Sequence, residues 1–303
     1  MDKKFTLFLT KGILTYIPML NNIRKKRDHT GGTESAEYCL RVFFNHIRSI
    51  TQILGLKEMP LNLLEFGPGD SLGVGLAYLL LGGKRYIAID SVEYSTPEIN
   101  KKILNELLVI INSYTFFNKY QPPLSLVSKQ SLKNHLSPDR ISRILNSIDN
   151  NDGDFFLYIS SPELNYNIIP NDTIDVIISQ AVMEHIDNIE VIYKLSYAKL
   201  KNNGIMSHQI DHRCHTLSDW WNGHWQYSDR LWKLAAGRRP FTLNRLTSSE
   251  HISLIRATGF QILKIDRHID KTGLPVLKFN HQFMNMSIAD AQTDGTYILA
   301  RKL

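Results

Sequence analysis

Cysteine is scarce in this chain: Cys39 and Cys214 are the only two among 303 residues. They lie far apart in the sequence and without the spacing of a metal site, which argues against a disulfide framework and fits a reducing compartment. We therefore expect a cytoplasmic protein.

Long apolar runs, internal repeats and low-complexity tracts are also absent. The most apolar N-terminal stretch, "KKFTLFLTKGILTYIPML" (3–20), is interrupted by Lys11, is too short to span a bilayer and lacks a small-residue cleavage site. Two interpretations remain for it. It is either a helix packed on the rest of the protein or a weak, peripheral membrane anchor.

Positive charge is present but is not concentrated. The net charge is +6 and the sequence pI is about 9.1, yet the basic residues are scattered except in the run Arg24–Arg27. The sequence therefore gives no strong signal for nucleic-acid binding. The content of 43% hydrophobic and 21% charged residues is ordinary for a globular protein, and the length fits one large α/β domain or two small ones.

Short strand-like runs, most of them separated by helical stretches, begin near residue 61 and predict a parallel sheet with crossover helices. Two further runs, 260–269 and 295–303, are joined by a loop alone and predict an antiparallel pair. We expect a seven-stranded, mostly parallel, Rossmann-like α/β sheet. Its other five strands are expected at 61–66, 85–90, 154–160, 174–179 and 204–210.

The chain is expected to begin with an N-terminal helical cap, residues 1–58, followed by the main domain, residues 59–303. Within the cap, Cys39, Val42, Phe43, His46 and Ile47 follow one helical stripe. Two long segments interrupt the main domain, at about 92–153 and 211–247. Because insertions after strand ends lie over the ligand crevice of an open α/β sheet, we expect these segments to form a lid and determine the substrate.

The first expected strand leads into a glycine-rich loop, "LLEFGPGDSLGVG" (63–75). Gly67 and Gly69 permit a tight turn and are expected to direct backbone N–H groups toward a ligand at a helix N-terminus. A dinucleotide fingerprint requires a third glycine at the position of Leu72. Its absence weakens the interpretation as a dehydrogenase.

Two carboxylates accompany this loop. Glu65 precedes Gly67 and would repel a pyrophosphate, whereas it can balance a cationic ligand. Asp90 ends the second strand, where a carboxylate can accept hydrogen bonds from both hydroxyls of a ribose. Together they predict a ligand with a ribose and a positively charged amino-acid end, which describes S-adenosyl-L-methionine.

Three segments resemble the successive motifs of class I S-adenosylmethionine-dependent methyltransferases of the methyltransferase type 11 kind: "LLEFGPGDSLG", "YIAID" and "IDVIISQAVMEHI". This resemblance covers about residues 60–210. Residues 31–47 and 206–245 also resemble a bacterial subgroup often associated with surface-polysaccharide genes. The resemblance implies O-methylation of a sugar or glycan intermediate, and hence a small-molecule or glycan acceptor.

The resemblance also implies roles for individual residues. Around the methionine end of the cofactor it places Glu65, Gly67, Pro68, Gly69 and Asp70. Asp90 would bind the ribose, and Gln180 would line the wall near the methyl group. The family commonly contacts adenine just after the third strand, where this chain has Ser160 and Ser161 in place of a clear aspartate.

Methyl transfer to a hydroxyl requires a base at the carboxyl edge of the sheet. Two stretches supply candidates, "QAVMEHI" after the fourth strand and "SHQIDHRCH" at the end of the fifth. A carboxylate beside an imidazole can orient and tune a base, so we name Asp211, His212, His208 and His185 as candidate catalytic residues. For each of them a purely structural role remains an alternative.

Other interpretations stay open. A metal-assisted RNA methyltransferase would use Glu184, His185, His208 and His212 as ligands, but Gln180 replaces a carboxylate that such enzymes have, and we predict no metal. A catalytically silent, cofactor-binding scaffold partner is a further alternative.

Tryptophans at helical spacing, Trp221, Trp225 and Trp232, predict either the buried face of a lid or a platform for a sugar ring. Arg238, Arg239 and Arg245 would then hold an acidic group of the acceptor.

Overall fold

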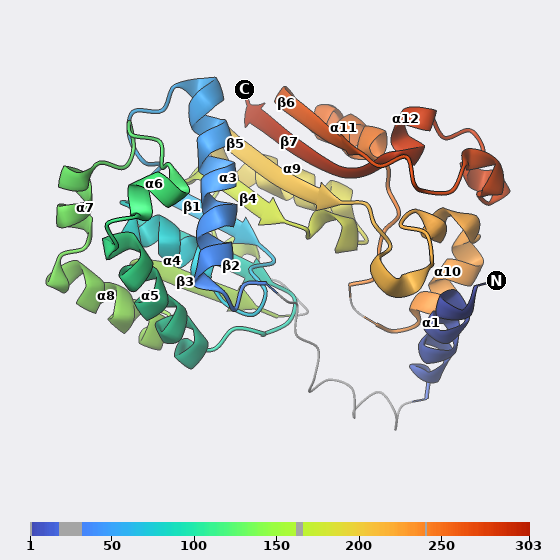
Figure 1. The fold of residues 1–303 in the computed structure, drawn as a ribbon, viewed down its shortest axis with the longest axis horizontal. Coiled ribbons are helices and arrows are strands. Elements are labelled where there is room, and N and C mark those ends of the chain that lie inside the picture. The colour runs from blue at the N-terminus through green and yellow to red at the C-terminus, as the bar shows by residue number, and fades with distance from the viewer. Residues whose placement is uncertain (1, 18–31, 162–165, 240) are drawn as a thin grey trace. The chain divides into compact units, whose positions relative to one another are not determined.

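The computed structural model describes residues 2–17, 32–161, 166–239 and 241–303. Seven strands form one sheet in the order β3-β2-β1-β4-β5-β7-β6 (Figure 1). The strands are β1 (Asn62–Phe66), β2 (Arg85–Asp90), β3 (Phe156–Ser160), β4 (Ile174–Gln180), β5 (Leu200–Asp211), β6 (Phe260–Ile269) and β7 (Thr293–Lys302). The predicted Rossmann-like α/β fold is confirmed.

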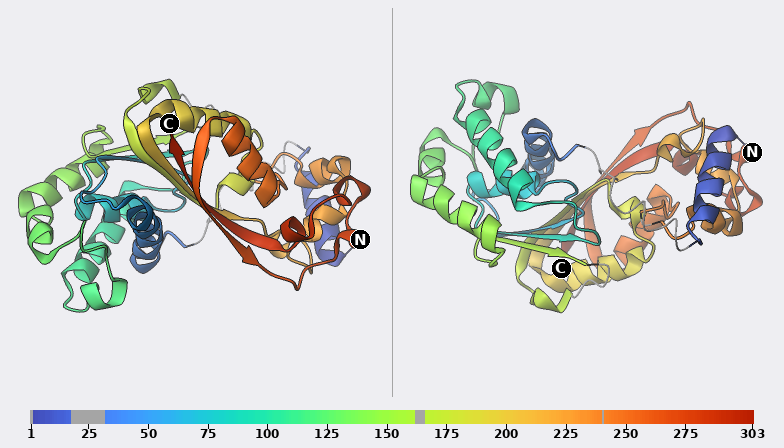
Figure 2. Two further views of the ribbon diagram at one scale, coloured as in Figure 1. Left: turned by 90° about the horizontal axis from the view of Figure 1, so that it is seen from above. Right: turned by 90° about the horizontal axis from the view of Figure 1, so that it is seen from below.

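Strand direction follows the sequence-based expectation. β1 pairs in parallel with β2 and β4, and β2 pairs in parallel with β3. At the other edge of the sheet, the N–H of Asp270 donates to the carbonyl of Gln292 (2.8 Å) and joins the end of β6 to the start of β7. These two strands therefore form the expected antiparallel pair, which Figure 2 shows as long and twisted.

Helices connect most of the strands, and none in the described part of the chain is long and apolar enough to cross a membrane. The helices are α1 (Lys3–Leu14), α3 (Ala36–Leu54), α4 (Gly73–Leu80), α5 (Pro97–Asn112), α6 (Phe116–Tyr120), α7 (Lys129–His135), α8 (Pro138–Asn150), α9 (Ile189–Lys199), α10 (Asp229–Ala236), α11 (Ser248–Ala257) and α12 (Ile288–Ala291).

The chain divides into two compact units. The first, which we call the glycine-loop unit, comprises residues 29–180, 194–207 and 299–303. The second, which we call the β6 unit, comprises residues 1–28, 181–193 and 208–298. Helices α1 and α3 of the expected cap therefore belong to different units, and the domain boundary at residue 58 stays a prediction.

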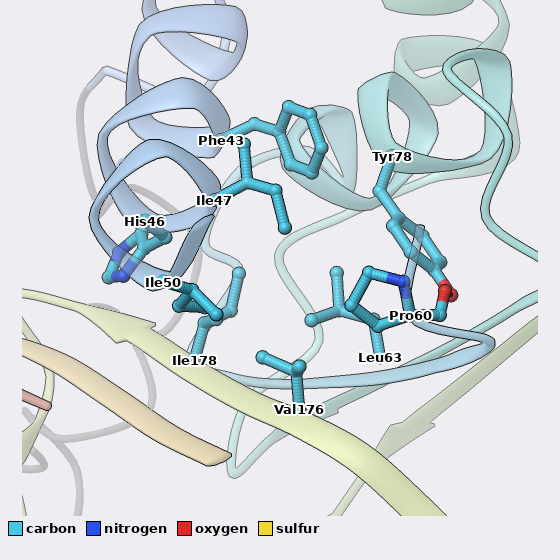
Figure 3. A pocket seen from close by; sticks show the side chains of 9 residues that line it. All are labelled: Phe43, His46, Ile47, Ile50, Pro60, Leu63, Tyr78, Val176 and Ile178. Atoms are coloured by element: carbon cyan, nitrogen blue, oxygen red, sulfur yellow. The ribbon is translucent and has the colours of Figure 1, made fainter. Parts of the chain in front are cut away.

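In the glycine-loop unit, α3 packs on α4 and α5 through the predicted stripe, all of which is buried. The fit with α4 is close, because a Cβ at Gly73 would lie 2.4 Å from Cys39 Sγ. Figure 3 shows a small apolar pocket that remains between α3 and the strands, lined by Ile47, Leu63 and Val176 among others. Helices α5 to α8 lie within residues 97–150.

In the β6 unit, α1 lies against α10 (Figure 1). Phe5 stacks on Tyr227 with 3.4 Å between ring centroids, and Phe8 and Trp232 complete the cluster. A Cβ at Gly12 would lie 2.0 Å from the carbonyl oxygen of Ala235, so only glycine permits this approach of α1 to α10. Residues 3–14 of the N-terminal stretch thus form a packed helix, which agrees with the first of the two interpretations, and residues 18–20 lie outside the described residues.

Candidate functional site

The glycine loop turns where the sequence predicted. Gly67 and Gly69 have φ values of +63° and +77°, in the left-handed region that side chains disfavour. The N–H of Gly67 donates to the carbonyl of Ile89 in the neighbouring strand (2.8 Å). This loop therefore carries β1 across the end of β2 before α4 begins.

Three backbone N–H groups that lead into α4 have partners within the protein. That of Ser71 donates to Thr33 Oγ1 (3.2 Å), that of Leu72 to Asn100 Oδ1 (2.9 Å) and that of Gly73 to Ser71 Oγ (3.2 Å). Thr33 and Asn100, from two other segments, and Ser71 of the loop itself therefore hold this turn. That other N–H groups of the loop face a ligand stays a prediction.

Glu65 lies one residue before the end of β1 and is almost fully buried (2% exposed). Its carboxyl accepts a hydrogen bond from the Tyr86 hydroxyl (2.5 Å). Burial raises the pKa of Glu65 to about 7; the Tyr86 hydrogen bond opposes that rise and the charge of Asp90 adds to it.

Asp90 ends β2 and is 7% exposed. Burial raises its pKa to about 6, although the N–H groups of Val92, Gly69 and Ser91 favour the charged form, and the charge of Asp70 raises it further. Its neighbour across the sheet is Ser160 in β3. The structure thus brings Glu65, Asp70 and Asp90 together around the glycine loop.

This set of groups fits S-adenosylmethionine. Among the described residues, neither Glu65 nor Asp90 forms an ion pair with a lysine or arginine. The charged form of a buried carboxylate that has no lysine or arginine partner is stabilised by a cationic ligand. An aspartate at the end of the second strand also suits the two hydroxyls of a ribose.

Gln180, the last residue of β4, is half-buried. Its side chain hydrogen bonds to His46 of α3, whose Nδ1 lies 2.7 Å from Ser207 Oγ. Burial lowers the pKa of His46 to about 4. Gln180 is therefore held in place by a buried polar chain that links α3 with β5.

In the β6 unit, Asp211 ends β5 and is half-buried; its Oδ1 accepts the N–H of Arg213 (2.9 Å). Its charge raises the pKa of Glu184, but burial contributes more, and that pKa reaches about 8. Glu184 Oε1 lies 3.9 Å from His185 Nε2, and the His185 ring stacks at 6.3 Å from that of His215. These residues form an acid–imidazole cluster.

His212 and His208 lie elsewhere in the same unit. His212 is 4% exposed, its Nε2 lies 2.9 Å from Thr296 Oγ1, and burial lowers its pKa to about 4. His208 is fully buried, with its ring 6.2 Å from that of Tyr193. His212, a candidate base, thus contacts β7 through Thr296 and lies with its ring 5.9 Å from that of His251 in α11.

Within the described ranges, no group of three or more His, Cys, Asp or Glu residues is arranged to hold a metal ion. The four residues of the metal-assisted alternative do not converge. Glu184 and His185 belong to the acid–imidazole cluster, whereas His212 hydrogen bonds with Thr296.

The tryptophans of residues 211–247 do not share one helix. Trp225 lies in a 3₁₀ turn (Gly223–Gln226) and Trp232 in α10, and both are buried. Their indole N–H groups donate to the carbonyls of Arg245 and Leu243, both at 3.0 Å. They are core residues and therefore cannot form a platform for a sugar ring. Trp220, in contrast, is 47% exposed.

The basic residues of the same segment are also engaged. Arg245 is 6% exposed, donates to the carbonyls of His224 and Tyr227, and pairs with Asp229. Arg239 donates to the carbonyls of Phe8 and Ala235. Both arginines hold the segment together and are not poised to bind an acidic acceptor.

Several residues of the glycine-loop site were not predicted from the sequence: Thr33, Tyr86 and Asn100. Tyr86 is the second residue of β2 and lies within an apolar run. That pattern predicts that Tyr86 is buried, but it does not predict a hydrogen bond from its hydroxyl. Thr33 is 38 residues from Ser71 in the sequence, and Asn100 is 28 residues from Leu72, the residues whose N–H groups they accept. Single-sequence patterns do not report such pairings.

Fold and site together define the class, the class I S-adenosylmethionine-dependent methyltransferases, which use S-adenosyl-L-methionine as cofactor. The chain belongs to the methyltransferase-domain family, whose model matches residues 40–265. It is an enzyme of that class.

Solved structures of similar fold have low sequence identity. An S-adenosylmethionine-dependent methyltransferase from Mesorhizobium loti is 12% identical, with a TM-score of 0.43, over 89% of this chain and 100% of that one. Phosphoethanolamine N-methyltransferase 2 of Haemonchus contortus is 12% identical, with a TM-score of 0.43, over 88% of this chain and 57% of that one. No match was found among curated proteins.

Proposed function

We propose that this methyltransferase O-methylates a hydroxyl of a sugar or glycan intermediate. The cofactor supplies an electrophilic methyl group. The acceptor oxygen gains that methyl group and loses its proton, so the protein must provide a proton acceptor. The observation that carries the proposal is the acid–imidazole cluster of Glu184, His185 and Asp211, since it suits an uncharged hydroxyl acceptor.

Accessibility ranks the candidate bases. The His185 side chain is 23% exposed and Asp211 is half-buried, so an acceptor can reach either residue. His212 and His208 are 4% and 0% exposed, and His212 is already hydrogen bonded. We therefore assign the base to Asp211 or His185, and a structural role to the other two histidines.

On the cofactor side, we assign the methionine end to the loop residues and to Glu65, whose raised pKa falls when a cation binds. Asp90 receives the ribose, and Ser160 beside it marks the adenine end. The hydrogen bond between His46 and Gln180 restrains the Gln180 side chain at the end of β4, where the methyl group is expected. The full set of proposed cofactor residues is Glu65, Gly67, Pro68, Gly69, Asp70, Asp90 and Gln180.

We also propose a cytoplasmic location, because both cysteines are free thiols. A weak peripheral membrane contact through α1 is compatible with its outer face, where Leu7 and Leu14 are 56% and 38% exposed. Residues 211–247 are proposed as the segment that selects the acceptor.

The test is product analysis. The purified enzyme is incubated with methyl-labelled S-adenosylmethionine and fractionated cell extract, and the labelled product is separated as saccharide, lipid, protein or RNA. Label in a saccharide as a base-stable methyl ether supports the proposal. Label only in RNA, or only in a base-labile ester, overturns it.

A further inference from the structure

The β6 unit contains a cavity of about 350 Å³ between the loop that follows β6 and the segment that leads into β7. Residues of 270–277 form one wall and residues of 288–292 form the other. The Asn222 side chain joins the two walls: it donates to the carbonyls of Leu274 and Ala291, both at 3.1 Å, and accepts the N–H of Leu274 (2.8 Å). The cavity is therefore built into the fold, and its volume is that of a small-molecule site.

Aliphatic side chains make up most of the lining of this cavity: Leu274, Pro275, Val276, Leu277, Ile288 and Ala291. Leu277 and Ile288 are 85% and 71% exposed, so both leave aliphatic surface in water. The described residues that line the cavity include no aromatic side chain, and a platform for a sugar ring would be aromatic. The cavity therefore suits an aliphatic chain, because covering these side chains removes apolar surface from water.

The remaining side chains of the lining are polar and lie at one side of the cavity. The N–H of Asp270 donates to the carbonyl of Gln292 (2.8 Å), and Lys271 follows Asp270 in the chain. One acid, one cation and one neutral amide balance in charge. Asp270 would repel a phosphate, whereas a balanced set of donors and acceptors suits hydroxyl groups. This side of the cavity thus favours an uncharged head that is rich in hydroxyls.

His268 and Asp294 lie one step further along the same two strands and continue the polar side. Asp294 is 2% exposed; its Oδ1 lies 2.5 Å from His268 Nδ1, and its Oδ2 accepts Nε–H of Arg213 (2.7 Å). Because residues two apart on a strand share a face, His268 lies on the same face as Asp270. The backbone N–H of Arg213 donates to Asp211 Oδ1 (2.9 Å). Arg213 therefore links the candidate base Asp211 with the polar side of the cavity.

We propose that this cavity binds the aliphatic aglycone of a glycoside, with the sugar head held by His268 and Gln292 beside Arg213. The His268 side chain is 72% exposed, so its Nε2 is accessible to a hydroxyl. The chain covers the exposed aliphatic wall, and the head meets the polar side. The acceptor of the methyl group is then a sugar that carries an aliphatic chain. That last step rests on the proposed function, whereas binding of the glycoside does not.

Alkyl glucosides below their micelle concentration are the probes, and calorimetry measures their binding without cofactor. Each added CH₂ should tighten binding by about 2- to 4-fold, so octyl glucoside should bind about 4- to 16-fold more tightly than hexyl glucoside. Octyl phosphate, which has the same chain and an anionic head, should bind at least about 5-fold more weakly than octyl glucoside. Equal affinities for the two glucosides overturn the proposal, and so does binding of octyl phosphate that equals or exceeds that of octyl glucoside.

Ile288→Ser tests whether the chain lies in the cavity. It removes part of the aliphatic wall and should weaken octyl glucoside binding by about 3- to 10-fold. The control is Val191→Ser, because Val191 is 48% exposed on α9 and does not line the cavity. Equal affinities for Ile288→Ser and Val191→Ser overturn the placement of the chain.

His268→Asn tests the sugar head. The asparagine amide keeps a donor for Asp294 and removes Nε2, so octyl glucoside should bind about 3- to 10-fold more weakly. Octyl tetraethylene glycol, which has the chain without the sugar, should stay within about twofold of its wild-type affinity. The control is His281→Asn, at an exposed position that does not line the cavity. No loss for octyl glucoside, or an equal loss for both ligands, overturns the role of His268.

The glycoside site and the proposed function fail in different ways. A protein that methylates a saccharide but binds no alkyl glucoside contradicts the glycoside site alone. A protein that binds alkyl glucosides as expected but methylates no saccharide contradicts the proposed function and retains the glycoside site.

Discussion

The Tyr86 hydroxyl donates a hydrogen bond of 2.5 Å to the buried carboxyl of Glu65 on the adjacent strand, two register positions from Leu63, the residue with which Tyr86 pairs. Tyr86 therefore holds the carboxyl inside the sheet, where burial raises the pKa of Glu65 to about 7. Asp90, with a pKa of about 6, is charged in part of the same range.

The affinity for S-adenosylmethionine is therefore expected to depend on pH. Below pH 6 both carboxyls are largely protonated and attract a cation less, so affinity rises from pH 5 to about pH 8 and then levels off. Bound cation lowers both pKa values, and binding near pH 6.5 releases protons. Calorimetry in buffers of different ionisation enthalpy measures that release. S-adenosylhomocysteine, which keeps the amino group and the ribose, should show the same dependence; proton uptake or a flat profile contradicts the prediction.

Asp90→Ala is expected to weaken cofactor binding by about 1 to 3 kcal/mol, the cost of removing a buried hydrogen-bond partner. Gly67→Val should weaken it more, because φ at Gly67 is +63° and a side chain enters the loop. Gly55→Val is the control, since Gly55 has φ +64° in open space beyond α3. It should lose stability but keep cofactor affinity. Wild-type affinity in a folded Asp90→Ala protein contradicts the role of Asp90.

Stability is expected to be greatest near pH 6.5. Folding lowers the pKa of buried histidines below 6.5, so the unfolded chain binds more protons and stability is lost as pH falls from about 6.5 toward 4. Folding raises the pKa of Glu184 from 4.5 to about 8, so stability is lost as pH rises through that range. The histidines are His46 and His212, with pKa values of about 4, and His224 and His251, lowered further by burial.

Glu184→Gln tests whether Glu184 causes the loss of stability as pH rises. The amide resembles the protonated acid, so urea unfolding at pH 4.5 or below should give a free energy close to wild type. At pH 8.5 the variant should be the more stable protein. Glu58→Gln, at an exposed position, is the control and should change neither value. If the free energy of unfolding changes with pH by the same amount in wild type and Glu184→Gln, Glu184 does not titrate in this range.

Strand patterns predicted the fold closely: the expected runs 85–90 and 260–269 coincide with β2 and β6. Alternation and apolar runs are local properties, so a single sequence carries them. The glycine loop and Asp90 were predictable for the same reason, because their chemistry follows from their place at strand ends. The partners of the loop, Thr33 and Asn100, come from other segments, and only the folded chain brings them together.

The tryptophans illustrate the opposite case. Helical spacing predicted one stripe on a single helix. Instead, Trp225 lies in a 3₁₀ turn that ends before α10 begins, and Trp232 lies in α10. Their indoles are fixed by carbonyls of residues 243 and 245, which periodicity does not reveal. His212 was likewise named as a candidate base, whereas its hydrogen bond to Thr296 depends on β5 and β7 being neighbours in the sheet, which local patterns do not reveal.

The outer face of α1 is expected to bind anionic membranes weakly. Leu7 and Leu14 are exposed there beside Lys3 and Lys11, while Phe5 faces α10. Sedimentation with phosphatidylglycerol vesicles should exceed that with phosphatidylcholine vesicles and should fall at high salt. A Leu7→Ser, Leu14→Ser double variant should lose several-fold, unlike Leu277→Ser, which removes a leucine that is 85% exposed elsewhere. Equal sedimentation of all proteins contradicts the membrane contact.

The last prediction concerns the base. Once an acceptor is found, Asp211→Asn or His185→Gln should lower turnover by about 100- to 10,000-fold, the usual contribution of a general base, with nearly unchanged cofactor affinity. His212→Gln should mainly lower stability, because it breaks the buried bond to Thr296. Rates are measured with and without chelator, since loss to chelator and rescue by a divalent ion would indicate a metal role. Near-normal turnover in both the Asp211 and His185 variants contradicts the assignment of the base to either residue.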